Sequence, residues 1–354
     1  MSLIVNLIVP FFFSVIVLGL AGVVNCYLKS KLTALALTLA SVMALPFFIS
    51  AIFQMSIAVG GKVSMVIVLA FFIMHLLNKG KFSDLFSLYE KGDLINIGFL
   101  AIFVFTVLLP GLWSGGYFIT NPNFDFIYQS VDSRYMNMYD PTIYNPMVGK
   151  FSDLPLNWSA NHQGRYLSSV VQSIMTYDLF LGRLIEGSVS SFIYFYIVFA
   201  ASLYLFFCSF LNNKRNALFA TLIALATTYG WAPVRYMLIG QLSSVSIFIL
   251  LIGGFSQILS SNIVPSLRKI FPLSVVLGFL SIIYFAFGFF AAVIIALLYL
   301  FSDIGVSIKR KVKLLSFPFF LAAIIYFIPY ISKPQVIIQI ILNWFEVIFS
   351  KMYL

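Results

Sequence analysis

Charge is scarce in this chain. Of its 354 residues only 9% are charged, whereas 62% are hydrophobic and phenylalanine alone occurs 40 times. An ordinary soluble domain has roughly 25% charged residues, and its polar surface could not cover so much apolar area. The composition therefore excludes a soluble globular fold and indicates that lipid surrounds much of the chain.

Cysteine and histidine are also scarce. Cys26 and Cys208 both lie within or at the edge of apolar runs, and there are two histidines. This usage predicts neither a disulfide framework nor a metal cluster. The sequence contains no phosphate-binding glycine loop and no HExxH, GxSxG or CxxC motif, so soluble-enzyme chemistry is not indicated. We expect no cofactor and no metal site, although a divalent cation stays open.

Long apolar runs are abundant, and many reach the ~20 residues that a helix needs to cross a hydrocarbon layer of about 30 Å. The sequence predicts an all-α, polytopic transmembrane helical bundle. Its expected spans lie near 3–27, 32–54, 63–78, 94–112, 190–211, 217–232, 236–257, 314–331 and 335–350. The run at 3–27 is too long for a signal peptide, and Lys29 and Lys31 follow rather than precede it. We therefore expect a retained first span with its N-terminus outside.

The formal net charge of +10 does not indicate nucleic-acid binding. The basic residues fall in short clusters at the ends of apolar runs, where they set the orientation of the spans. The KRKVK stretch at 309–313 is such a cluster. The expected partner of this surface is the lipid bilayer, with no nucleic acid.

The apolar segment 271–301 is too long for one ordinary span, since about 31 helical residues would extend some 46 Å. If it crossed once, the 309–313 cluster would lie on the side opposite Arg268 and Lys269. If it is a hairpin that turns near Tyr284, both clusters lie inside, as the positive-inside rule requires. The hairpin brings the expected total to about 11 spans.

This topology divides the chain into three parts. They are an N-terminal four-span region at 1–112, an outer-face loop at 113–189 and a C-terminal helical membrane region at 190–354. A loop this long is expected to be functional. It carries six acidic residues, which are Asp125, Asp132, Asp140, Asp153, Asp178 and Glu186.

The candidate catalytic residues are Asp125 and Asp132. Asn123 is a suitable N-cap for an amphipathic helix from Phe124 to about 138, lying at the membrane interface. The two aspartates are seven residues apart and share one face of that helix. A carboxylate at a partly dehydrated surface is more basic than one in water, as a general base requires. The alternative is a pair of solvated loop carboxylates, and Asp140 before Pro141 is read as a turn residue.

Basic residues of the outer face are candidates for binding a phosphate, because guanidinium groups match phosphate oxygens. These candidates are Arg134, His162, Arg165, Arg183 and Arg235. The alternative for each is a contact with lipid headgroups, and Arg235 could snorkel to the interface. A second short helix is expected from 164 or 165 to 177. His75, near the inner end of a span, has no acidic partner evident in the sequence and is read as interfacial.

Three features together resemble the integral-membrane glycosyltransferases of the GT-C class. They are an acidic residue shortly after an outward span, in NFDFIYQSVDSRYM, a long outer loop with interfacial helices, and the hairpin-like LGFLSIIYFAFGFFAAVIIALLYLF between basic inner loops. The stretch KRNALFATLIALATTYGWAPVRYMLIGQLSS adds to them. The resemblance covers roughly residues 94–330. It implies a donor sugar carried on polyprenyl phosphate, Asp125 or Asp132 as the base, and Arg165, Arg183 and Arg235 as phosphate contacts. The chain departs from the class in two ways. Three spans precede the span that leads into the loop, and no paired acidic dipeptide is present.

The leading hypothesis is therefore a membrane glycosyltransferase that transfers a sugar to a cell-surface glycan or glycolipid, with its active site on the outer face of the cytoplasmic (inner) membrane. A lipid-linked glycan flippase or transporter is one alternative. It should show internal repeats and charges lining a path across the membrane, and neither is evident in the sequence. A polymerase or ligase of the O-antigen type is the other, since Arg134, Arg165 and Arg183 suit it almost as well.

Overall fold

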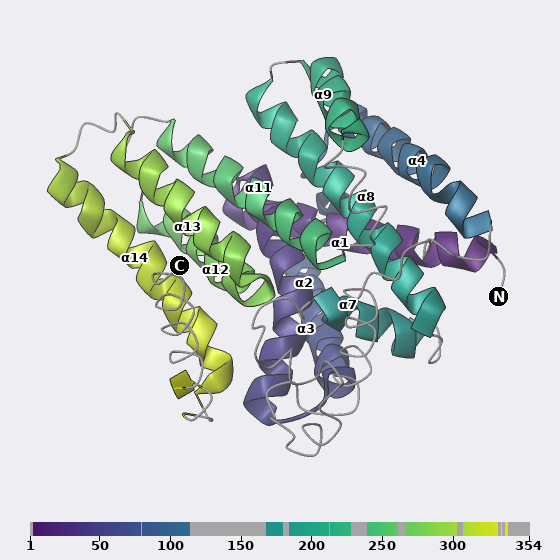
Figure 1. Ribbon diagram of the computed structural model, residues 1–354, viewed down its shortest axis with the longest axis horizontal. Helices are drawn as coiled ribbons and strands as arrows, with labels where there is room; N and C mark the ends of the chain where they lie inside the picture. Colours follow the sequence, from purple (N-terminus) through teal and green to yellow (C-terminus); the bar gives the residue numbers. More distant parts are fainter. Residues whose placement is uncertain are drawn as a thin grey trace, which may run out of the picture.

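The protein is a bundle of helices (Figure 1). The computed structural model describes residues 3–78, 80–113, 168–179, 184–211, 213–227, 239–260, 266–302 and 307–331, together with residues 334, 337 and 338. Within these ranges every regular element is a helix. The all-α class is thereby confirmed, and the protein is a multi-pass membrane protein.

The first part of the described chain is a series of long apolar helices. It consists of α1 (Leu3–Leu28), α2 (Lys31–Phe53), α3 (Ile57–Leu77), the 3-10 helix η1 (Phe82–Phe86) and α4 (Lys91–Trp113). These helices match the first four expected spans closely. The largest difference is at α3, whose helix already includes Gly60, Gly61 and Lys62 and begins six residues before the span predicted at 63.

The second part begins with two short elements, α7 (Ser168–Ser173) and the π-helix η3 (Ile174–Leu179). Six further α-helices follow, which are α8 (Leu184–Phe210), α9 (Lys214–Ala226), α11 (Ile239–Leu259), α12 (Leu267–Ile283), α13 (Phe285–Leu300) and α14 (Ile308–Phe327). A short 3-10 turn, η4 (Ile328–Tyr330), ends the continuous part. The span expected at 335–350 lies almost wholly outside the described residues.

Seven helices are long and apolar enough to cross a membrane, namely α1, α2, α3, α4, α8, α11 and α14. The total of about 11 spans is not reached within the described chain. The helix α9 is 13 residues long, and α12 and α13 have 17 and 16 residues, which at 1.5 Å per residue is about 25 Å or less.

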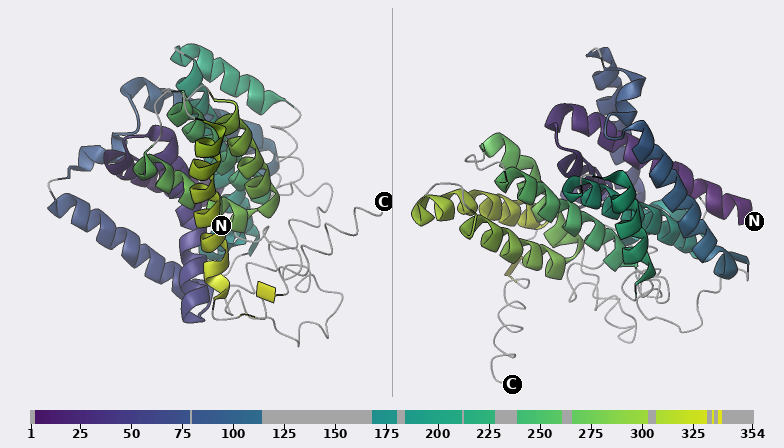
Figure 2. Two further views of the ribbon diagram at one scale, coloured as in Figure 1. Left: turned by 90° about the vertical axis from the view of Figure 1, so that its left-hand side faces the viewer. Right: turned by 90° about the horizontal axis from the view of Figure 1, so that it is seen from above.

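The core lies along α2 and α8. Tyr194, Tyr196 and Tyr204 of α8 are among the largest fully buried side chains, and α2 contributes Phe47 and Met43. The helix α3 lies at the edge of the bundle (Figure 2, left) and exposes a row of large apolar side chains. Lipid tails, rather than water, suit such a surface.

Proline occurs inside five of these helices, at Pro10, Pro46, Pro110, Pro272 and Pro318. Proline normally breaks a soluble helix because it lacks an N–H group. In a membrane, side-chain hydroxyls and neighbouring helices satisfy the freed backbone groups. The Ser14 hydroxyl donates to the Pro10 carbonyl at 2.7 Å, a bond that serine often makes within its own helix.

The break predicted near Tyr284 is confirmed. Tyr284 has extended backbone angles (φ −156°, ψ 98°) and separates α12 from α13. The two helices then pack against each other, since a Cβ on Gly288 would lie 2.6 Å from the Cα of Ser281. In a continuous helix residues seven apart would be about 10 Å apart along the axis. The chain therefore reverses here, and glycine permits the close approach.

Basic side chains are concentrated at one end of the bundle, which we call the basic end. This is the end at which α2, α4, α9, α12 and α14 begin, and it faces the upper edge of Figure 1. Close contacts connect its parts, because Gly254 of α11 approaches both Thr33 of α2 and Leu273 of α12. Apart from Lys62, every lysine and arginine side chain that the structure describes lies at this end.

Candidate functional site

The predicted site residues lie outside the described part of the chain. These residues are Asp125, Asp132, Arg134, His162, Arg165, Arg183 and Arg235. The interfacial helix expected from Phe124 to 138 lies outside it as well. Their roles stay predictions, and the described residues show only the elements on either side of residues 114–167.

The second short helix of that segment is present, although it takes a different form. The expected helix ending at 177 appears as α7 followed by the π-helix η3. Val170, Val171 and Met175 are fully buried, because this element packs among α2, α3, α8 and α11. The chain thus returns from residues 114–167 directly into the interior of the bundle.

Polar side chains gather where α7 and η3 pack against α8. The buried polar patch consists of Gln172, Ser173 and Thr176 on α7 and η3, and Ser190 and Ser191 on α8, all at most 1% exposed. Hydroxyl and amide groups are dense in SSVVQSIMT and SVSS, but a prediction made from charged residues alone missed this patch.

The hydrogen bonding of the patch is incomplete within the described residues. The Ser191 hydroxyl donates to the Gly187 carbonyl at 2.7 Å and lies 3.4 Å from the Met175 sulfur. The hydroxyls of Thr176 and Ser190 have no hydrogen-bond partner among the described residues. A buried hydroxyl without a partner costs about 1–3 kcal/mol. π-Helices, moreover, occur frequently at functional sites. The patch is therefore a polar region inside an otherwise apolar bundle.

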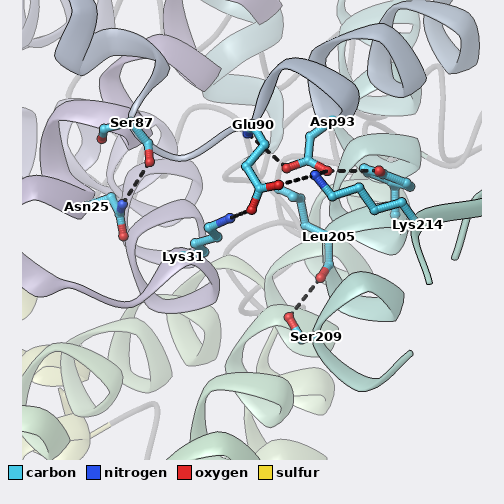
Figure 3. A network of polar contacts seen from close by, with 9 residues as sticks. Asn25, Lys31, Ser87, Glu90, Asp93, Leu205, Ser209 and Lys214 are labelled. Carbon is cyan, nitrogen blue, oxygen red and sulfur yellow. Dashed lines mark hydrogen bonds and ion pairs between the residues drawn. The ribbon is translucent and has the colours of Figure 1, made fainter. Parts of the chain in front are cut away.

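A second polar cluster lies at the basic end (Figure 3). Lys214 at the start of α9 lies between two acids, with its Nζ 2.5 Å from Glu90 Oε2 and 3.0 Å from Asp93 Oδ1. Lys31 of α2 approaches the other oxygen of Glu90 at 3.8 Å. These ion pairs connect the starts of α2, α4 and α9.

Asp93 extends this cluster into the bundle. Its side chain is 3% exposed, and its Oδ2 accepts the backbone N–H of Glu90 at 2.9 Å, which caps the start of α4. The Tyr204 hydroxyl donates to Asp93 Oδ1 at 3.0 Å and in turn accepts from Asn96 at 2.9 Å. All the polar groups around Asp93 are thus paired, and the arrangement fastens α4 to α8.

The electrostatics of this cluster do not favour catalysis by its exposed acid. The hydrogen bond from Lys214, together with the charges of Lys214 and Lys31, lowers the pKa of Glu90. In return, the hydrogen bond to Glu90 raises the pKa of Lys214, with Asp93 adding to the effect. A general base needs a pKa raised toward neutrality, so these paired groups are better suited to holding helices together.

The prediction that His75 has no acidic partner is wrong. His75 Nε2 lies 2.9 Å from Asp84 Oδ2, and its Nδ1 lies 3.0 Å from the Tyr27 hydroxyl. Asp84 also accepts the backbone N–H of Lys81 at 2.7 Å, and this bond is the main cause of its lowered pKa. The helix η1 folds the chain back over the end of α3, which makes His75 buried rather than interfacial.

Metal-ligating residues do not gather in the described ranges, where no three of His, Cys, Asp and Glu come together. Both cysteines are free thiols there. Comparison with known protein families, with curated proteins and with solved structures finds no match to this chain. Its function therefore has to be argued from its own residues.

Proposed function

We propose that this chain is a membrane glycosyltransferase that moves a sugar from a polyprenyl-phosphate carrier to a cell-surface glycan or glycolipid acceptor. The observation that carries the proposal is the two-ended distribution of polar groups. Basic side chains gather where α2, α4, α9, α12 and α14 begin. The end of α4 and the start of α7, which flank residues 114–167 in the sequence, instead lie toward the opposite end.

The orientation follows from the positive-inside rule, which assigns clustered lysine and arginine to the cytoplasmic side. The basic end then faces the cytoplasm, and both the N-terminus and the segment 114–167 lie on the outer face of the cytoplasmic membrane. A carrier-linked sugar is available to an enzyme whose active segment lies there.

The chemistry assigned to the outer segment is an inverting transfer. Asp125 or Asp132 takes the proton of the acceptor hydroxyl as its oxygen attacks the anomeric carbon. The bond between that carbon and the carrier phosphate breaks, and polyprenyl phosphate leaves. Arg165, Arg183 and Arg235 hold the phosphate, with Arg134 and His162 as further contacts. The leaving group is already a membrane lipid, so the reaction needs no nucleotide.

The buried polar patch supports this assignment. It lies where the chain re-enters the bundle after residues 114–167, so polar groups are present in the interior next to the end of the proposed catalytic segment. By contrast, the described acids at the basic end are already paired with lysine or histidine.

The direct test is transfer of labelled sugar from carrier lipid to acceptor by the purified protein in liposomes. We expect the Asp125→Asn, Asp132→Asn double variant to lose activity by about 100-fold or more, as removal of a general base does. The matched control is Asp140→Asn, which removes a charge from the same segment and should remain active. Full activity in a folded double variant would refute the proposed base.

The same assay separates the alternative functions. Passage of a carrier-linked glycan across the liposome membrane without a new glycosidic bond would support a flippase or transporter instead. A ladder of products, rather than the addition of one sugar, would support a polymerase or ligase.

A further inference from the structure

The structure brings together two basic clusters that are 40 residues apart in the sequence. Helices α12 and α14 pack closely, and a Cβ on Gly278 would lie 2.8 Å from Ile325 Cβ and 3.2 Å from Ala322 Cα. They run in the same direction, because the chain reverses at Tyr284 and the start of α14 lies against the end of α13. Their first turns therefore lie at the same end of the bundle, as does the end of α13.

Lys311 fixes this arrangement from inside. Its side chain is buried, and its Nζ donates to the carbonyl oxygens of Leu300, at 3.1 Å, and Ser302. Leu300 is the last residue of α13 and Ser302 lies just beyond it, where unpaired carbonyls can be capped by a lysine. Lys311 is thus occupied within the protein and holds the start of α14 against the end of α13.

The remaining basic side chains of both first turns are exposed. We call this set the α12–α14 surface, and it consists of Arg268, Lys269, Lys309, Arg310 and Lys313. None of these five has an acidic partner among the described residues. The three acids described at the basic end are paired elsewhere, Asp84 with His75, and Glu90 and Asp93 with Lys214.

The helix starts add to the positive potential. Ser266 and Ser307 occupy the N-cap positions in extended conformation, and neither side chain caps its helix. The first N–H groups of both helices are consequently available to an anion, and the two helix dipoles point the same way. A surface of this kind attracts phosphate.

Large apolar side chains are interleaved with the basic ones and identify the kind of ligand. Leu267 is 54% exposed, Phe271 51%, Phe301 82%, Ile308 72% and Val312 53%. A soluble acidic protein or a nucleic acid would leave these side chains in water. A lipid supplies both a phosphate for the cations and acyl chains for the apolar groups.

We propose that the α12–α14 surface binds the phosphate headgroup of an anionic phospholipid at the cytoplasmic face. The ligand is a membrane lipid, distinct from the carrier substrate of the outer face, and the site stands independently of the proposed transfer activity. It is assembled by the hairpin at Tyr284, which returns α14 alongside α12.

The test measures lipid retention by the purified full-length protein with native mass spectrometry, after titration with phosphatidylglycerol or phosphatidylcholine in detergent. We expect wild-type protein to retain phosphatidylglycerol preferentially. The Arg268→Gln, Lys269→Gln, Lys309→Gln, Arg310→Gln variant should lose this preference by about tenfold or more, because each basic residue near a charged membrane contributes several-fold.

The matched control removes the same number of charges from elsewhere at the basic end, as Lys29→Gln, Lys81→Gln, Lys91→Gln, Arg215→Gln. It should keep the preference. Equal losses in the two variants would show a general charge effect and overturn the site, and so would a fully retained preference in the first. Displacement of the lipid by millimolar inorganic phosphate would also overturn it, because the ligand would then be free phosphate. A Lys269→Arg, Lys309→Arg variant, which keeps the charge, guards against misfolding and should bind as wild type.

Discussion

Glu90 and Asp93 bind the same lysine but differ in what surrounds them. The Glu90 side chain is 67% exposed, and its pairs with Lys31 and Lys214 are open to solvent. Asp93 is buried and accepts hydrogen bonds from the Glu90 amide and the Tyr204 hydroxyl in addition to its pair with Lys214. Exposed ion pairs contribute little to stability, whereas removing one member of a buried pair is costly.

Asp93→Ala should accordingly be more damaging than Glu90→Ala. Truncating Asp93 leaves the Tyr204 hydroxyl without its acceptor and the first turn of α4 without its cap, with an expected loss of about 2–3 kcal/mol. The measurement is thermal unfolding of the detergent-solubilised protein. Equal unfolding temperatures for the two variants would contradict the difference in burial.

The pH dependence of this cluster follows from its lowered and raised pKa values. Because the pKa of Glu90 is lowered in the folded protein, its contribution is present above the ordinary glutamate value of about 4.3 and is lost as pH falls through the lowered value. The raised pKa of Lys214 keeps that group charged up to at least its ordinary value of about 10.4.

We therefore expect the difference in unfolding temperature between wild type and Glu90→Gln to be constant from about pH 5 to pH 9 and to shrink below about pH 4. Unfolding scans at a series of pH values measure it. A difference that instead disappears near pH 6–7 would indicate control by a histidine rather than by Glu90.

At the scale of elements, the hairpin of α12 and α13 depends on a close approach at Gly288. Substituting Gly288 by alanine would drive a methyl group against the Cα of Ser281, so the turn at Tyr284 would have to open. Gly98 of α4 provides a matched control, because a Cβ there would meet nothing within 4 Å.

Gly288→Ala should lower the unfolding temperature, whereas Gly98→Ala should leave it unchanged or raise it slightly, since alanine favours a helix by up to about 1 kcal/mol. Both variants are compared in the same unfolding assay in detergent. The hairpin geometry would be contradicted if Gly288→Ala were as stable as Gly98→Ala.

Sequence reasoning predicted these elements well for a physical reason. In a membrane a span must be long, apolar and helical, so α1, α2, α4 and α8 could be located from apolar runs alone. The turn at Tyr284 followed from the balance of charge on the two sides. By contrast, the pairing of His75 with Asp84 depends on how η1 folds back, and no periodicity encodes that contact.

The helical element formed by α7 and η3 shows a second limit of prediction from the sequence. A short helix ending at 177 was expected, but its burial among four other helices and its π-helical part depend on packing between distant segments. The hydroxyl groups of the buried polar patch carry no charge, and they could not be distinguished in the sequence from serines bonded to their own helix.

The molecule as a whole has two chemically different ends. Basic groups and paired acids occupy one end, and the segment that carries Asp125 and Asp132 begins and ends at the other. The proposed transfer and the proposed lipid site belong to opposite faces of the membrane, so both depend on the same topology.

Labelling of single cysteines tests that topology most directly. In a chain with Cys26 and Cys208 replaced by serine, one cysteine is placed at Gln54, Ser133 or Ser307 and treated in whole cells with a membrane-impermeant maleimide. We predict labelling at positions 54 and 133 in intact cells, and labelling at 307 only after the membrane is permeabilised. Labelling of position 307 in intact cells, with 133 protected until permeabilisation, would contradict the account.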